Sequence, residues 1–166
     1  MATNKMSVQT YNPADVLLDI GGYTLAGWES ISISRRSLGF ITVPGIRGKH
    51  TRVPSGDSSA TITISLLQLS PSNDVLSYIH ELDLDEGTGR IALTLKDKSG
   101  RSVFSSDEAY ILGYPEVTFS GTFEYRTWSI FCQTTKTYLV GGNTKPETKL
   151  FDTAFDKVKS FANNIF

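Results

Sequence analysis

Two stretches that alternate between polar and apolar residues place the strongest constraint on the fold. Residues 29–35 read Glu-Ser-Ile-Ser-Ile-Ser-Arg, and within residues 58–67 Ser or Thr alternates with Ala, Ile or Leu. Successive side chains of a strand point to opposite faces of a sheet, so each stretch is predicted to be a half-buried strand. If the two strands pair, they share one polar, uncharged face, made of Ser30, Ser32, Ser34, Ser59, Thr61, Thr63 and Ser65.

Shorter signals predict a mostly β chain with one internal helix. Gly21-Gly22 suits a two-residue hairpin turn, and residues 123–138 form the longest strand candidate. Ser70 and Pro71 are typical of a helix start, so we expect a helix near residues 71–83, ended by Gly87. The strand signals together indicate a β-sandwich of about seven to nine strands.

The chain divides into three parts on these signals. Residues 16–143 form the β domain, and residues 1–15 are predicted to be an N-terminal arm. Apolar residues spaced by three and four predict an amphipathic helix over residues 149–166, within a linker-and-helix segment that spans residues 144–166. This helix is expected to dock either on its own domain or on a neighbouring subunit.

Residues 36–57 are predicted to be an extended loop because glycine and proline are dense there. From Arg35 to Pro54 the chain contains several basic residues and no acidic one. The same segment contains several apolar residues. The residues concerned are Arg35, Arg36, Phe40, Ile41, Val43, Ile46, Arg47, Lys49 and Arg52. A long loop with exposed apolar residues usually has a partner. The opposite charge gathers in the predicted helix, at Asp74, Glu81, Asp83, Asp85 and Glu86.

The sequence predicts neither catalysis nor a cofactor. Its two histidines, His50 and His80, lie in no catalytic motif, and His80 is expected on the polar side of the helix. The acidic cluster does not have the spacing of an EF-hand loop, so a solvated surface is the favoured interpretation, and no metal site is predicted. The single cysteine, Cys132, is predicted to be a buried thiol. A net charge of −1 disfavours stable nucleic-acid binding.

The segment Ala60 to Leu76, ATITISLLQLSPSNDVL, resembles a family of phage structural proteins. In that family a strand of the type (G/A)TITVxLLxTSPxNxxL runs directly into a helix. These proteins resemble the tail tube subunits of contractile-tailed bacteriophages, and the likeness covers roughly residues 14–140. It implies two packed antiparallel β-sheets with a helix, in subunits that form hexameric rings. The rings stack into a hollow tube.

The same resemblance implies a place in the virion, as part of the phage tail, after assembly in the cytoplasm of the host bacterium. The implied partners are other copies of the chain, the tail sheath protein, and the baseplate and tail terminator proteins. A tape-measure protein and, transiently, DNA would occupy the lumen.

Two hypotheses follow for the surfaces described above. The polar face of the paired strands is predicted to line the channel, the alternative being an ordinary solvated outer face. The basic loop is predicted to reach into the next ring and meet the acidic helix end there. Alternatively, both charged runs are solvated or meet within one subunit.

A different class of function also fits the predicted fold. A monomeric β-sandwich could be a binding or adhesion module, such as a carbohydrate-binding domain. Within the first class, another tail or baseplate part with the tube fold is the rival. The apolar basic loop and the apolar C-terminal helix favour assembly over a ligand-binding module.

Overall fold

The computed structural model of the protein describes residues 8–142 and 156–160. Along this part of the chain the elements are, in order, η1 (Pro13–Asp15), β1 (Val16–Ile20), β2 (Tyr23–Thr24), β3 (Trp28–Arg35), β4 (Phe40–Pro44), β5 (His50–Pro54), β6 (Ala60–Leu67), α1 (Ser72–Glu86), β7 (Ile91–Asp97), β8 (Val103–Ile111), β9 (Tyr125–Cys132) and β10 (Thr135–Leu139). Residues 156–160 are also helical.

The strands form two antiparallel sheets of unequal size. The larger has eight strands in the order β2-β1-β7-β8-β9-β6-β3, with β10 also paired to β8, and the smaller is the β4–β5 hairpin. The predicted fold, mostly β with two antiparallel sheets, one internal helix and a C-terminal helix, is confirmed. The strands are divided unequally between the two sheets, whereas a symmetrical sandwich has sheets of similar size.

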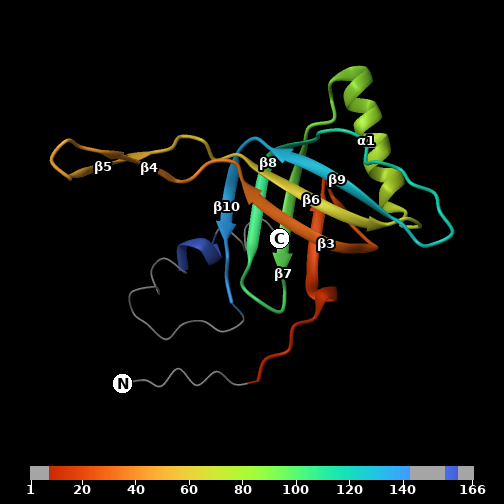
Figure 1. Cartoon of the computed structure of the whole chain (residues 1–166). Coiled ribbons are helices and arrows are strands. Elements are labelled where there is room, and N and C mark those ends of the chain that lie inside the picture. Colours follow the sequence, from red (N-terminus) through yellow and green to blue (C-terminus); the bar gives the residue numbers. More distant parts are fainter. Residues whose placement is uncertain (1–7, 143–155, 161–166) are drawn as a thin grey trace.

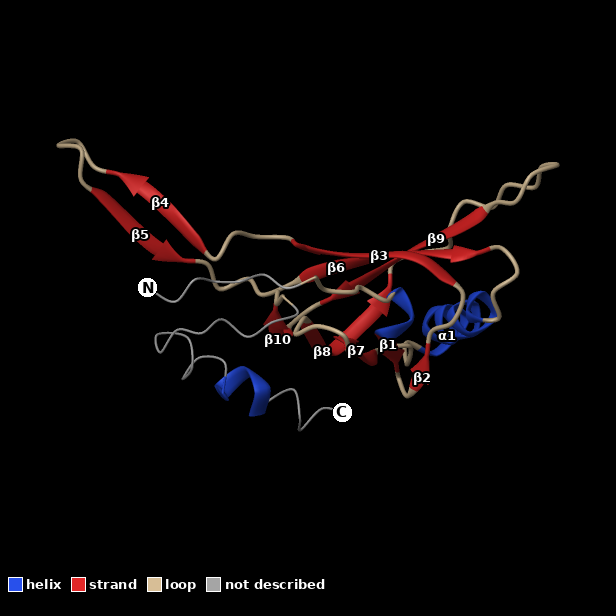
Figure 2. Cartoon of the chain, turned by 90° about the horizontal axis from the view of Figure 1, so that it is seen from below, coloured by secondary structure: helices blue, strands red, loops and turns tan. Residues whose placement is uncertain are grey.

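The larger sheet curls at β8, which changes partners along its length. The first half of β8 lies between β7 and β10, and its second half pairs with β9. A register shift in the β7–β8 pairing, between Leu93 and Ile91, marks an irregularity where this change occurs. Bulges bend a strand and increase its twist, which accounts for the curl. As a result, β3, β6 and β9 cross over β1 and β7 (Figure 1; Figure 2).

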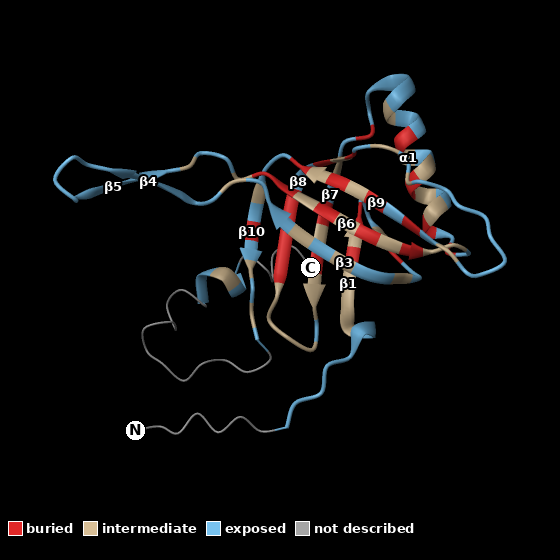
Figure 3. Cartoon of the chain, viewed as in Figure 1, coloured by how far each residue is buried: buried red, intermediate tan, exposed pale blue. Residues whose placement is uncertain are grey.

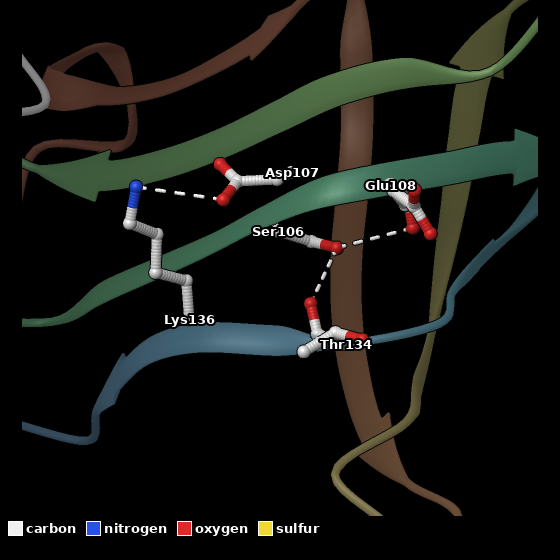
Figure 4. Close-up of polar contacts among 5 residues, drawn as sticks. All are labelled: Ser106, Asp107, Glu108, Thr134 and Lys136. Carbon is white, nitrogen blue, oxygen red and sulfur yellow. Dashed lines mark hydrogen bonds and ion pairs between the residues drawn. The ribbon is translucent and has the colours of Figure 1, made fainter.

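Polar contacts hold β10 against the bend of β8 (Figure 4). The Ser106 hydroxyl lies 2.7 Å from the backbone oxygen of Thr134 and 3.2 Å from that of Glu108, and can donate to either. Lys136 Nζ lies 3.4 Å from Asp107 Oδ2 in an exposed ion pair. Exposed pairs contribute little, so the buried hydroxyl of Ser106 is the more important contact here.

The apolar core fills the space between the two halves of the curled sheet. On β6, buried and half-buried residues alternate from Ala60 to Leu67 (Figure 3). Large core side chains come from both halves of the sheet and from α1, and those that are at most 2% exposed are Leu18, Ile20, Ile62, Ile64, Leu66, Leu76, Leu93, Phe104, Trp128 and Ile130.

The Ser-Pro-Ser-Asn junction between β6 and α1 is a dense hydrogen-bond network. Ser70 Oγ donates to the Ala26 oxygen at 2.6 Å and accepts from the Ser72 nitrogen at 3.2 Å. Asn73 donates to the Leu67 oxygen at 2.9 Å and accepts from Trp128 Nε1 at 3.0 Å. The junction therefore joins β6, β9 and the β2–β3 connection to the start of α1.

Three details differ from the sequence-based expectations. The predicted loop 36–57 contains the paired strands β4 and β5. The predicted strand 123–138 is interrupted after Cys132, where the pairing passes from β9 to β10. The helix begins at Ser72, as the Ser-Pro signal predicts, but continues to Glu86. Of the predicted C-terminal helix 149–166, only residues 156–160 are described, and they are helical, while the linker from residue 144 lies outside the described residues.

Candidate assembly surfaces

The β4–β5 hairpin projects away from the larger sheet as an arm. All ten of its strand residues are exposed, in contrast to the alternating burial of β6 (Figure 3). Its turn is tight: the Gly45 nitrogen donates to the Lys49 oxygen at 2.7 Å, and Gly48 has a φ of +75°. At its base, the Ser37 and Ser55 hydroxyls lie 2.9 Å apart. The arm is thus an ordered hairpin without a core of its own.

The two faces of the hairpin differ in chemistry. The register places Ile41 opposite Val53 and Val43 opposite Thr51, so one face is almost wholly apolar. The other face carries Phe40 and Arg52, whose guanidinium lies 4.3 Å from the centre of the Phe40 ring. Apolar side chains left in water on both sides of a ribbon indicate a surface that is buried in a complex.

The predicted basic residues are distributed over the arm and its base. Arg47 and Lys49 lie in or beside the turn, and Arg52 lies on β5. Arg35 is instead the last residue of β3, and Arg36 follows it at the base of the arm. Beside them, hydrogen bonds from Ser59, followed by the charges of Arg36 and Arg35, lower the pKa of Asp57 below its usual value.

The predicted acidic residues do not form one cluster. Asp74 lies in the first turn of α1, roughly 16 Å along the helix axis from Asp85 at a rise of about 1.5 Å per residue. Asp83 Oδ1 accepts a hydrogen bond from the Gly89 nitrogen at 3.0 Å, so this carboxylate shapes the end of the helix. Asp85 and Glu86 are exposed in a last turn that contains no basic residue. Acids there oppose the helix dipole, so helix stability does not explain them.

Glu81 accepts a hydrogen bond from the Tyr114 hydroxyl, and this bond raises the pKa of Tyr114 to about 12. The Tyr114 ring also packs edge-on against His80, with 4.8 Å between ring centres. His80 is buried, so the expectation that it lies on the polar side of the helix is wrong. Its aromatic contact with the loop after β8 explains the burial. Within residues 8–142, no ion pair joins the hairpin to α1.

The predicted polar face is assembled by three strands. β3 pairs with β6 in the register that places Ser32 opposite Thr63 and Ser34 opposite Thr61. β9 extends the face, because Thr127 pairs with Ser65 and their hydroxyls lie 3.3 Å apart. Ser59 does not belong to this face. It precedes β6 and is only 4% exposed, beside the Asp57 turn that binds its backbone nitrogen.

Little in the described residues suggests chemistry. No group of three or more His, Cys, Asp or Glu among them could hold a metal ion. Within the same residues, no helix has the length and apolar character needed to cross a membrane. Cys132 is fully buried, and burial raises the pKa of its thiol to about 11, which disfavours the nucleophilic thiolate. The exposed apolar and charged surfaces described above are the candidate functional features.

A comparison of sequences finds a relative for almost the whole chain. Structural protein ORF10 of Pseudomonas phage KPP10 is 37% identical over 155 residues, which cover 87% of this chain and 89% of the relative. The chain belongs to the family of this phage structural protein. No family model matches the sequence. The predicted resemblance to phage structural proteins is confirmed at this level.

Solved structures with the same fold come from contractile injection systems. A chain of the PVC sheath–tube complex in the extended state matches with a TM-score of 0.54 and 12% identity, over 76% of this chain and 89% of that one. The tube-terminating cap of the anti-feeding prophage gives 0.54 and 13%, over 82% and 97%. The PVC sheath/tube terminator gives 0.51 and 15%, over 78% and 97%. At these identities the likeness shows the fold alone, which this chain shares with components of contractile injection systems.

One exposed apolar surface of this chain was not predicted from its sequence. Residues 112–124 connect β8 to β9. The structure has no regular secondary structure there, and Val117 and Phe119 are exposed. The sequence does contain a signal for an exposed apolar loop here, because Gly113, Pro115 and Gly121 interrupt a set of apolar residues. Segment 36–57 has the same combination of apolar residues with glycine and proline.

Proposed function

We propose that this phage structural protein is a self-assembling subunit of the hollow tube of a contractile tail. The β4–β5 hairpin carries the proposal, because an ordered arm with apolar side chains in water needs a partner. The family relationship and the fold shared with components of contractile injection systems support a tail part over an adhesion module. Each copy would be a virion component acting through assembly and without catalysis.

In this proposal, copies associate side by side into hexameric rings, and rings stack through the hairpin. β3 favours lateral association, because it pairs with β6 along one edge and has no strand partner on its other edge among the described residues. An open edge of eight residues is a template for pairing with another chain. The sheath, baseplate and terminator proteins would bind the outside and ends of the resulting tube.

The polar face of β3, β6 and β9 would then line the channel. Its Ser and Thr side chains are uncharged, and retention of DNA needs cations that face the phosphates. Such a surface would let DNA and a tape-measure protein pass without holding them. The proposal predicts that cysteines at Ser32→Cys and Thr63→Cys are shielded from a bulky thiol reagent in assembled tubes but not in monomers. Equal labelling in both states would place this face elsewhere.

Negative-stain microscopy of the purified full chain tests the proposed function most directly. Long hollow rods support a tube subunit. A terminator or cap is the second candidate, since two of the fold neighbours are a cap and a terminator and are matched over 97% of their length. Isolated rings would favour that role, and featureless monomers would favour a binding module.

The charges of the hairpin provide a second test. Arg47→Glu together with Lys49→Glu should block stacking while each copy remains folded, because both residues are exposed and distant from the core. Reversal of Asp85 and Glu86 to Lys should partly restore stacking, if these acids receive the hairpin. Asp83 is unsuitable for this test because its carboxylate holds the Gly89 backbone. Full-length rods from the first double variant at low salt would contradict the charge pairing.

A further inference from the structure

The loop between β8 and β9, residues 112–124, is an apolar surface at the end of the molecule. Phe119 is 80% exposed, and Val117 and Phe123 are each about half exposed. In Figure 1 the loop runs past α1 to the right-hand end of the molecule, while the hairpin forms the left-hand end, and Figure 2 shows the same separation. Apolar side chains this exposed, and grouped in one segment, indicate a contact surface.

Contacts at Tyr114, at Thr118 and Phe119, and at Glu124 anchor the loop, although it has no regular secondary structure. Arg126 Nη1 donates to the Thr118 oxygen at 3.2 Å, and its guanidinium lies 5.3 Å from the centre of the Phe119 ring. The Gln68 nitrogen donates to the Glu124 oxygen at 3.2 Å, and the Glu124 nitrogen donates back to the Gln68 side chain at 3.3 Å. Tyr114 anchors the loop to α1 through Glu81. A surface ordered before binding loses less entropy on association.

The loop and the hairpin are complementary in charge as well as apolar character. Glu116 and Glu124 are the loop's only charged residues, and Asp85 and Glu86 lie on the adjoining helix α1. The hairpin is basic, with Arg47, Lys49 and Arg52, and contains no acid. Apolar residues on both sides can supply buried area, while opposite charges set the orientation.

We propose that loop 112–124 is the surface on which the β4–β5 hairpin of a neighbouring copy docks. Because the two lie at opposite ends of one molecule, the contact joins different surfaces of two copies. Such a head-to-tail contact can repeat from copy to copy, as stacking in a tube requires. The inference rests on the proposed function and deepens it, since it assigns the apolar partner of the hairpin to the loop and leaves the acids of α1 in a supporting role.

Disulfide trapping between two singly substituted full-length chains tests the contact. One chain carries Ile46→Cys at the hairpin tip, where Ile46 is fully exposed, and the other carries Phe119→Cys in the loop. The matched control replaces the second chain with Tyr78→Cys on α1, because Tyr78 is 77% exposed and Phe119 80%. A size tag on one chain separates mixed dimers from homodimers, and buried Cys132 stays reduced. We expect the mixed dimer with Phe119→Cys to form in several-fold excess over that with Tyr78→Cys.

The outcomes separate this inference from the proposed function. Equal or preferred trapping by Tyr78→Cys would move the docking surface to α1 and overturn the inference, while assembly through the hairpin would stand. Wild-type rods without either mixed dimer would overturn the inference alone. Wild-type protein that forms neither rods nor rings would overturn both. Circular dichroism of each variant checks that the chain is folded.

Association measurements give a second readout that does not depend on disulfide geometry. Phe119→Ser should weaken association about tenfold or more, which corresponds to about 1.4 kcal/mol, because aromatic residues are enriched among the few interface residues that contribute most to binding. Tyr78→Ser, the matched aromatic on α1, should change association less than about twofold. Sedimentation velocity over a concentration series measures both. Unchanged association of Phe119→Ser would contradict the inference even if the disulfide forms.

Discussion

The Ser-Pro-Ser-Asn junction buries polar side chains, whereas the β4–β5 hairpin exposes apolar ones. At the junction, Ser70 and Ser72 are buried, and Ser70 and Asn73 hydrogen-bond to segments far away in the sequence. In the hairpin, Ile41 and Val53 face each other across two strands with no layer above them. The junction therefore contributes to the stability of one chain, whereas the hairpin has side chains available for another chain.

This contrast distinguishes residues that select the fold from residues that select the partner. A buried polar group must find its hydrogen bonds within the chain, since an unpaired one costs about 1–3 kcal/mol. An exposed apolar side chain has no such constraint within the chain, and its burial in a complex stabilises only the complex. Substitutions in the junction should therefore lower the stability of each copy, and substitutions in the hairpin should affect association alone.

The largest effect is expected at Trp128, where the junction meets the core. Trp128 is 2% exposed and donates from Nε1 to Asn73. Trp128→Ala should lower the free energy of unfolding by about 3–5 kcal/mol, because it opens a large cavity. Trp128→Phe, which fills most of the space but lacks the N–H group, should cost distinctly less. Urea denaturation measures both. A loss below about 1 kcal/mol for the alanine variant would show that the core lies elsewhere.

Cys132 tests the burial of the same region through its chemistry. Burial raises the pKa of the thiol from its usual value of 9.0 to about 11, so thiolate at pH 8 should be about 100-fold scarcer in the folded protein than in the unfolded chain. Alkylation should be slowed by at least that factor. Ser32→Cys on the exposed polar face provides an internal reference that should react quickly in the monomer. Equal rates at the two thiols would contradict the burial.

The raised pKa of Cys132 also makes the free energy of unfolding depend on pH in a defined direction. Between pH 9 and 11 the folded chain keeps a proton that the unfolded chain releases. The contribution of Cys132 to stability is therefore complete below pH 9 and decreases as the pH rises through this range. Cys132→Ala should remove that part of the pH dependence, measured by urea denaturation at pH 8 and pH 10.5.

A smaller loss is expected at Asn73. Asn73→Ala removes the acceptor of Trp128 Nε1 and the donor to the Leu67 oxygen, so it should cost about 1–3 kcal/mol. Asn73→Asp keeps the acceptor and loses the donor, and should lie between the wild type and the alanine variant. The difference between the two variants in thermal unfolding measures the contribution of the Trp128 bond. Identical values would show that this bond contributes little.

The parts of the fold that could be predicted were those dominated by local pattern. The alternation in residues 29–35 and 58–67 predicted β3 and β6, and in the structure the two strands pair with Ile31 opposite Ile64. The Ser-Pro signal predicted the start of α1. The break after Cys132 could not be predicted, because it follows from the bend of β8, which lies in a different part of the sequence.

The candidate surfaces were predictable in composition but not in geometry. Segment 36–57 was recognised as apolar and basic, yet its glycines and prolines concealed two strands, and only the register separates the Ile41 face from the Phe40 face. Ser59 shares the sequence spacing of Thr61 but precedes the strand, so it turns inward. Loop 112–124 was missed because nothing local indicates which apolar residues its neighbours leave uncovered.

The smallest effect on stability, and the sharpest test of the contrast, is expected in the hairpin. Ile41→Ser together with Val53→Ser removes most of the apolar face, but both residues are exposed, so the free energy of unfolding should change by no more than about 0.5 kcal/mol. Association of copies should nevertheless be lost, measured by sedimentation velocity. Thr42→Ser, on the opposite face of the same strand, is the matched control and should associate like the wild type. A double variant that unfolds easily would mean that the hairpin belongs to the domain core. One that is stable and still assembles would mean that other surfaces join the copies.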